Sequence, residues 1–136
     1  MKTIFNILLF YGFIVLTAFS CEKENSKTVC IEGNVIGYEQ CEKATLIEVK
    51  SFAIMGKTIT YYEVGKEDTV YNNVIKSPGL YPKGKIYFTY REYNSDIDYK
   101  LFLYDPPQAC PQNIIPYDAT IYVITNYSQT NCQEVK

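Results

Sequence analysis

The sequence contains no histidine and no tryptophan. Without histidine, the chain cannot build a Ser-His-Asp triad, a Cys-His pair, a histidine metal site or a histidine proton shuttle. Catalysis would have to rely on carboxylates, tyrosine or lysine, and so would lack the commonest general acid and base. We therefore predict a protein that is not an enzyme and that uses no cofactor and no metal ion.

The chain also lacks a marked excess of either charge. Thirteen Lys and Arg residues stand against fifteen Asp and Glu residues, which gives a net charge of −2. There is no long run of like charges and no Gly-rich phosphate-binding motif. Since a nucleic-acid-binding surface would need a basic face, we predict no nucleic-acid partner.

The first residues are apolar and end at an isolated cysteine. Met1-Lys2 provides a positive start, residues 4–19 are mostly apolar, and Cys21 follows Ser20. The apolar run is shorter than the about 20 residues that a membrane-spanning helix needs, which favours an export signal. Plain secretion after cleavage at Ser20 and a retained helix are the alternatives.

The letters "AFSC", which end at Cys21, resemble the lipobox of bacterial lipoproteins, although that motif usually has Leu at the place of Ala18. The resemblance implies a lipoprotein signal peptide over residues 1–20 and lipid attachment at Cys21. Residues 21–28 would then be the lipidated cysteine and a flexible polar tether, and the acyl chains would hold the protein at a membrane. Residues 22–24 are similar to the charged tag of surface-exported Bacteroidetes lipoproteins. We expect an outer-membrane protein that faces the periplasm or the cell surface.

Four further cysteines are Cys30, Cys41, Cys110 and Cys132. An exported protein meets an oxidising compartment, so we expect disulfides, and four cysteines allow three pairings. We favour Cys30–Cys132 and Cys41–Cys110, because the outer two lie near the ends of the domain and the inner two flank its middle. A zinc site made of all four is the alternative, but no Cys-x2-Cys spacing supports it.

Short strand signals follow one another from residue 29 onward, because β-branched and aromatic residues alternate with polar ones. We predict about seven strands, at residues 29–36, 44–49, 58–64, 69–75, 86–91, 99–104 and 120–127. Gly33 and Gly37 suit a β-bulge in the first of them, and no segment has a convincing helical period. The pattern predicts one all-β domain over residues 29–136. It would be a small closed or partly open barrel (OB-like) or a sandwich, stapled by disulfides.

The segments "GNVIGYEQC", "KGKIYFTYR" and "IYVITN", in this order, resemble small Bacteroidetes lipoproteins with an OB-like barrel. Those proteins have a Gly-Val first strand, a cysteine before the second strand and a Gly-Lys entry to a later strand. The chain departs from a standard OB fold because no helix is evident between its middle strands. The resemblance implies a membrane-anchored barrel and adds little about the ligand.

Tyrosine is abundant, with fourteen copies. If Tyr87 and Tyr122 point outward on adjacent strands, they form an aromatic patch together with Tyr90 and Arg91. Such patches stack on sugars or anchor protein partners. The alternative is that half of the tyrosines pack in the core and half are solvated. We predict a non-catalytic binding module at the membrane, whose partner is a glycan, a peptide or another envelope protein.

Three other features give competing hypotheses. Asn94, Asp96 and Asp98 have the spacing of a calcium loop, but Tyr99 stands where that loop requires glycine, and a hairpin turn explains them better. The candidate acids of a carboxylate-based hydrolase are Glu48, Glu63, Glu92 and Asp98. Nothing in their spacing selects the two that must face each other across a cleft. Finally, the Pro-rich loop of residues 105–118 would suit a structural or inhibitor protein, in which it enters a partner's site.

Overall fold

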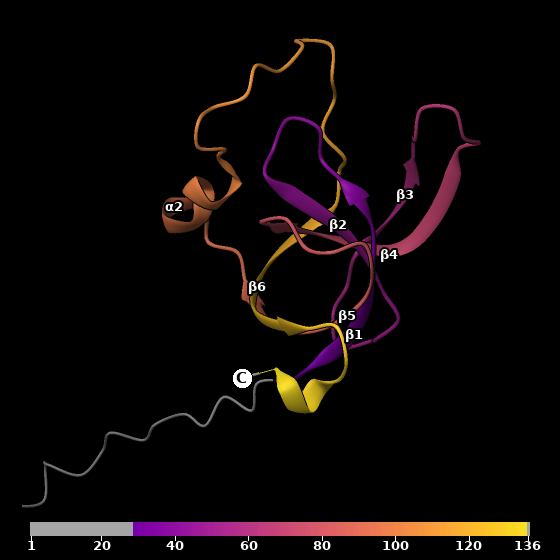
Figure 1. Cartoon of the computed structure of the whole chain (residues 1–136), viewed down its shortest axis with the longest axis vertical. Coiled ribbons are helices and arrows are strands. Elements are labelled where there is room, and N and C mark those ends of the chain that lie inside the picture. Colours follow the sequence, from indigo (N-terminus) through magenta and orange to yellow (C-terminus); the bar gives the residue numbers. More distant parts are fainter. Residues whose placement is uncertain (1–28, 136) are drawn as a thin grey trace, which may run out of the picture.

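The computed structural model describes residues 29–135, so the predicted signal peptide, Cys21 and the tether lie outside the described residues. The regular elements are, in chain order, β1 (Ile31–Tyr38), β2 (Ala44–Val49), β3 (Lys57–Tyr61), β4 (Thr69–Pro78), β5 (Gly84–Glu92), α2 (Ser95–Asp98), the 3-10 helix η1 (Tyr99–Phe102), β6 (Thr120–Ser128) and the 3-10 helix η2 (Cys132–Glu134). Figure 1 shows curled strands whose longer connections gather toward one end of the molecule.

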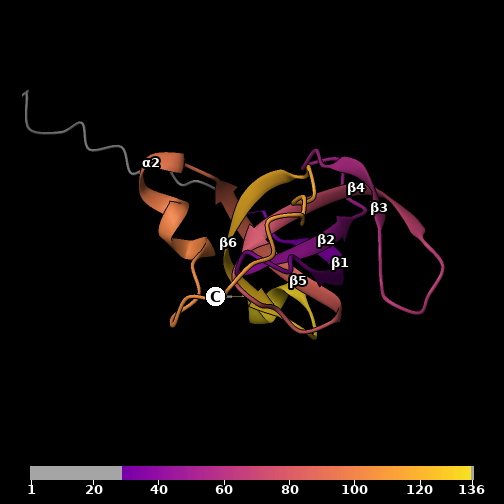
Figure 2. The ribbon, with the colours of Figure 1, turned by 90° about the horizontal axis from the view of Figure 1, so that it is seen from above.

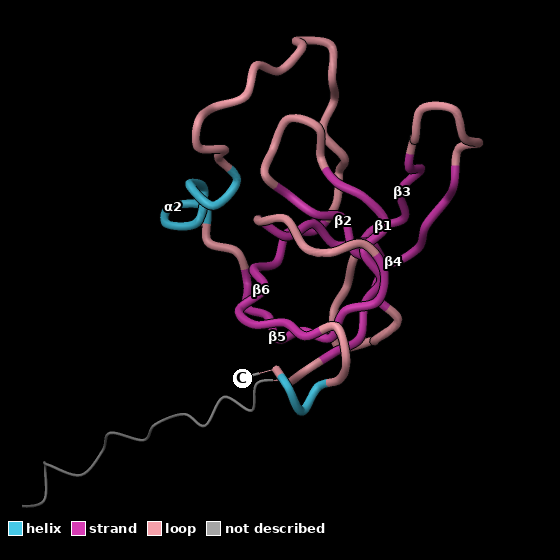
Figure 3. The backbone as a smooth tube through the Cα atoms, viewed as in Figure 1, coloured by secondary structure: helices cyan, strands magenta, loops and turns pink. Residues whose placement is uncertain are grey.

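The strands form one sheet in the order β2-β1-β5-β6-β4-β3, and β2 also pairs with β4. The pairings therefore run round a ring of five strands (Figure 3), while β3 extends the edge of β4 outside that ring. Only β4 and β6 pair in parallel, and they do so over two residue pairs, Ile75 with Thr120 and Lys76 with Ile121. This narrow seam leaves the barrel partly open. The predicted class, an all-β domain stapled by disulfides, is confirmed, with six strands where about seven were predicted. Of the predicted alternatives, the single sheet is compatible with the partly open, OB-like barrel.

The predicted strand at residues 99–104 is wrong, and the ring has no place for it. Both edges of β5 are already occupied, since β1 pairs on one side and β6 on the other. The segment instead turns into α2 and η1. Asn94 starts the helix, because its side chain accepts a hydrogen bond from the amide of Asp96 at 2.9 Å. The same cap replaces the hairpin turn predicted there.

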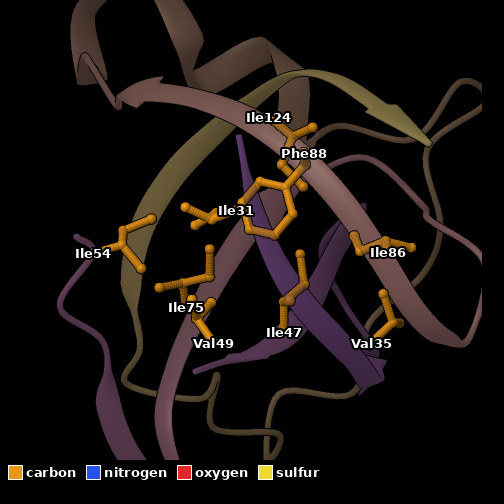
Figure 4. Close-up of a cluster of buried hydrophobic side chains, with 9 residues drawn as sticks. All are labelled: Ile31, Val35, Ile47, Val49, Ile54, Ile75, Ile86, Phe88 and Ile124. Carbon is orange, nitrogen blue, oxygen red and sulfur yellow. The ribbon is translucent and has the colours of Figure 1, made fainter. Parts of the chain in front are cut away.

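An inner core fills the barrel, and Figure 4 shows its side chains converging from all five strands of the ring and from the loop after β2. Its members are aliphatic apart from one phenylalanine: Ile31, Val35, Ile47, Val49, Ile54, Ile75, Ile86, Phe88 and Ile124. Alternation along each strand places them on one face. Phe88 has no solvent-accessible surface, and Gly33 makes room for its ring, because a Cβ there would lie 2.9 Å from the ring edge.

A second apolar group, which we call the outer cluster, lies on the other face of the same strands. It consists of Ile36, Leu46, Ile59, Val74 and Ala119, with Tyr61, Tyr71 and Tyr117 packed against them. The predicted bulge in β1 contributes to it, since the register with β2 shifts between Val35 and Gly37. Val35 faces the inner core and Ile36 faces the outer cluster, as alternation along a strand requires. The ring of Tyr61 lies directly over Gly37, where a side chain would collide with it.

Two disulfides join Cys30 to Cys132 and Cys41 to Cys110, which is the pairing that the sequence favours. The first ties the start of β1 to η2, and the second ties the β1–β2 loop to the Pro-rich segment. The two bonds indicate an oxidising, extracytoplasmic environment. Within residues 29–135, no helix is both long enough and apolar enough to cross a membrane. Seen from above (Figure 2), α2 and the β3–β4 hairpin stand on opposite sides of the barrel.

Candidate functional site

A cleft of about 570 Å³ opens over the outer cluster. One side is formed by residues 38–40, at the end of β1, and another by residues 57–62, which include all of β3. The third side is the segment of residues 114–118, which ends the long connection before β6. These three segments are far apart in the sequence and come together because β3 leaves the ring of strands. The cleft thus depends on the irregular parts of the chain as well as on the barrel.

Three polar contacts hold the segment of residues 114–118 against the barrel. The amide of Tyr117 donates to Oε1 of Glu39 at 2.8 Å, and the phenol oxygen of Tyr117 accepts from the amide of Tyr62 at 3.0 Å. Lys57 at the start of β3 pairs with Asp118, with 2.6 Å between Nζ and Oδ1. Tyr117 therefore joins both walls of the cleft, through its backbone to one and through its ring to the other.

Glu39, which lines the cleft, belongs to a buried charge network. The side chain of Glu39 is 2 % exposed and that of Lys76 is 7 % exposed; their charged atoms lie 3.7 Å apart. Lys76 Nζ also lies 2.8 Å from Oε2 of Glu42 and above the ring of Phe102. Burial raises the pKa of Glu39 above its ordinary value, although the amide of Tyr117 and the ammonium group of Lys76 both oppose the rise. Burial likewise raises the pKa of the Tyr117 phenol.

The walls are aromatic and aliphatic. The rings of Tyr61 and Tyr117 are 5.6 Å apart between centroids and tilted by 31°. Tyr62 and Ile115 are 60 % and 88 % exposed, so their side chains remain available to a ligand. The cleft can therefore offer flat apolar surface together with hydroxyl groups and the exposed carboxylate of Asp118, which is a typical arrangement for binding a partly polar ligand.

The predicted patch of Tyr87, Tyr90, Arg91 and Tyr122 is not formed as a unit. Tyr87 pairs with Ser128 and Tyr122 pairs with Glu92, at opposite ends of the β5–β6 ladder. The two tyrosines are therefore roughly 16 Å apart along the strands. Tyr122 packs inward against the inner core, with its ring at right angles to that of Tyr90 and 5.5 Å from it. Tyr90 faces inward as well, because alternation along β5 places it on the same face as Phe88.

Arg91 is held by Asp98 rather than by the tyrosines. Its two terminal nitrogens donate to the two carboxylate oxygens of Asp98, at 2.7 and 2.6 Å. This bidentate pair and the amide of Asn94, which donates to Oδ2 at 2.9 Å, lower the pKa of Asp98 to about 2. Asp98, the third ligand in the calcium hypothesis, is thus already bound by Arg91 through both of its carboxylate oxygens. No group of three or more acids or cysteines within the described residues is arranged to hold a metal ion.

The remaining candidate acids lie apart from one another. Glu48 lies in β2 opposite Asn34, Glu92 ends β5, and Glu63 follows β3, where Lys66 lowers its pKa. The cleft instead contains two acids that sequence reasoning missed, Glu39 and Asp118. The sequence did contain one signal for the cleft. Tyr61 and Tyr62 are adjacent in a strand pattern, and one face of a strand takes only one of two adjacent side chains.

Compared with known protein families and with curated proteins, the chain shows no match. The geometry of the cleft therefore carries the functional argument. Its most telling features are the exposed side chains of Tyr62 and Ile115 and the exposed carboxylate of Asp118.

Proposed function

We propose that this protein is a non-catalytic binding module of the cell envelope and that its cleft takes a segment of an oligosaccharide. The observation that carries the proposal is the exposed ring of Tyr62 in a cleft that is also lined by hydroxyl groups and by the exposed carboxylate of Asp118. Tyrosine faces pack against the apolar faces of sugar rings, while hydroxyls and carboxylates accept hydrogen bonds from sugar hydroxyls. Tyr62 is the most accessible ring of the cleft and would be the main stacking surface.

The position of the cleft supports the same ligand class. In OB folds, the loop between the first two strands of the barrel and the loop before its last strand bind oligonucleotides or oligosaccharides. Here those loops supply residues 38–40 and 114–118. Nucleic acid is disfavoured, because Lys57 is the only cation in the lining and it is already paired with Asp118. A neutral, hydroxyl-rich ligand suits such a surface better.

Membrane anchoring is the second part of the proposal. The lipobox-like residues before Cys21 support lipid attachment there, at the outer membrane, as in the Bacteroidetes-type lipoproteins that the sequence resembles. Radiolabelled palmitate should label the wild-type protein and leave the Cys21→Ala variant unlabelled. Equal labelling of both proteins would refute the anchor. The result does not affect the oligosaccharide proposal, which concerns the cleft alone.

A glycan array probed with the Cys21→Ala protein tests the cleft. For any glycan that binds, Tyr62→Ala should weaken binding by roughly tenfold or more, as the loss of an interface hot spot does. Tyr99→Ala is the matched control, because Tyr99 is a comparably exposed tyrosine on η1, outside the cleft. Equal effects of the two substitutions, or no binding to any glycan, would refute the proposal. Shortening of a bound glycan would instead indicate a hydrolase that uses Glu39 and Asp118.

One further observation favours a second candidate function, that of a structural or inhibitor protein. Every residue from 105 to 113 is exposed, and the Cys41–Cys110 disulfide fixes the segment to the β1–β2 loop. A constrained, exposed loop loses little entropy when it enters a partner's site. Crosslinking from Gln108 in whole cells would identify such a partner. The candidate fails if crosslinks from Gln108 are no more abundant than those from Gln129, an exposed residue after β6.

A further inference from the structure

The loop between β2 and β3 presents two large apolar side chains to solvent. Phe52 is fully exposed and Met55 is 77 % exposed, yet Ile54 between them is buried in the inner core. Figure 4 shows Ile54 reaching toward the other core residues from its loop. Ile54 therefore anchors the loop in the inner core, while Phe52 and Met55 project outward.

The loop is held firmly by side-chain hydrogen bonds. Asn73 adopts a positive φ of 51° and donates from its side chain to the carbonyl of Val49 at 2.7 Å. The same side chain accepts from the amide of Gly56 at 2.6 Å. On the other side, the phenol of Tyr90 donates to the carbonyl of Ala53 at 3.1 Å. Both ends and the middle of the loop are fixed, so the exposure of Phe52 and Met55 is built into the fold.

These side chains lie at the end of the barrel where the described chain begins. In the antiparallel β1–β2 ladder, Gly33 pairs with Val49. The start of β1 and the loop that follows Val49 therefore lie at the same end of this ladder. Val29, the first described residue, is itself 53 % exposed. In Figure 1, β1 starts at the bottom of the barrel, and the loops that form the cleft lie toward the top.

We propose that Phe52 and Met55 enter the interfacial region of the membrane to which the protein is anchored, so that the cleft points away from the bilayer. The inference rests on the lipid attachment at Cys21 proposed above. Seven residues separate Cys21 from Val29, and they span at most about 25 Å. The tether therefore keeps this end of the barrel close to lipid, at a high effective concentration. Phe and other large apolar side chains bury at the boundary between head groups and acyl chains, and an apolar pair on a fixed loop needs no reordering to insert.

The absence of tryptophan from the sequence makes a direct test possible. Phe52→Trp introduces a single fluorescent probe at the proposed contact, and Val64→Trp introduces one at a fully exposed position in the β3–β4 connection. Both full-length, lipidated variants are reconstituted into phosphatidylethanolamine and phosphatidylglycerol vesicles whose acyl chains carry bromine. The Trp at position 52 should shift to shorter wavelength and lose much of its emission by contact quenching. The Trp at position 64 should change little.

Each other outcome overturns the proposal in a distinguishable way. If both variants float with the vesicles and neither is quenched, the anchor stands and the membrane contact does not. Equal quenching at both positions means that the domain lies on its side. A shift of the position-52 emission that depends on protein concentration, without quenching, means that a second copy covers Phe52. If neither variant floats with the vesicles, the lipid anchor and the contact fail together.

Discussion

The inner core and the outer cluster are built on opposite faces of the same strands, and they differ in chemistry. Adjacent residues alternate between them: Leu46 and Val74 face the outer cluster, whereas Ile47 and Ile75 face the inner core. The inner core contains only aliphatic and aromatic side chains. The outer cluster is covered by β3 and by residues 117–119, and it borders the buried pair of Glu39 and Lys76. The inner face thus stabilises the barrel, while the outer face positions the cleft.

The largest expected difference between the two regions is in how much stability is lost when a side chain is truncated, and Phe88 should show the greatest loss. Phe88→Ala should lower the free energy of unfolding by about 3–5 kcal/mol, because the cavity would lie in the middle of a closely packed core. Ile59→Ala in the outer cluster should cost about 2 kcal/mol, near the lower limit for such truncations, since Ile59 lies in the edge strand β3. Urea denaturation measures both. Equal losses would mean that the two regions contribute alike.

Phe52→Ala is the matched control for this pair, because Phe52 is fully exposed. It should leave the free energy of unfolding within about 0.5 kcal/mol of the wild-type value. A large loss there would show that truncating a phenylalanine destabilises this domain wherever it lies. The contrast between Phe88 and Ile59 would then say little about the two regions.

The sequence predicts the inner core well because its information is local. Alternation along residues 86–91 alone places Ile86 and Phe88 on one face, and β5 is found there. Alternation does not predict the outer cluster, because Ala119 and Tyr117 belong to a segment in which apolar residues do not recur at a regular spacing. Residues 99–104 show the converse error: they alternate, yet both edges of β5 are taken. Periodicity reports which residues share a face, but it does not report whether a neighbouring strand edge is free.

The next largest effect should come from removing the cation of the outer region. Lys76→Met leaves the nearly buried carboxylate of Glu39 without its counter-charge, and we expect a loss of roughly 3 kcal/mol at neutral pH. Adding Glu39→Gln to Lys76→Met should restore part of that stability, because the uncompensated charge is then gone. Glu42 remains partly exposed and can be solvated. A double variant less stable than Lys76→Met alone would contradict this account.

The pH dependence of stability should also separate the outer region from the inner core. Burial raises the pKa of Glu39 in the folded protein above its ordinary value near 4.5. Its contribution to stability is therefore fully present below about pH 4.5 and is lost as the pH rises through the folded-state pKa. Melting temperatures between pH 4.5 and 7 should fall with rising pH in the wild type and less steeply in Glu39→Gln. Identical slopes would mean that Glu39 keeps an ordinary pKa.

The smallest effect should come from Asp98, whose shift has the opposite sign. Arg91 and the amide of Asn94 lower its pKa from 3.8 to about 2. The stability that Asp98 contributes is therefore present above about pH 4 and is lost as the pH falls toward 2. Asp98→Asn should lower the melting temperature by a few degrees at neutral pH and should flatten the fall between pH 4 and 2. Arg91→Lys is the informative companion, because it keeps the positive charge but removes the bidentate contact. If Arg91→Lys matches the wild type throughout, simple charge attraction rather than the paired hydrogen bonds fixes α2 at the end of β5.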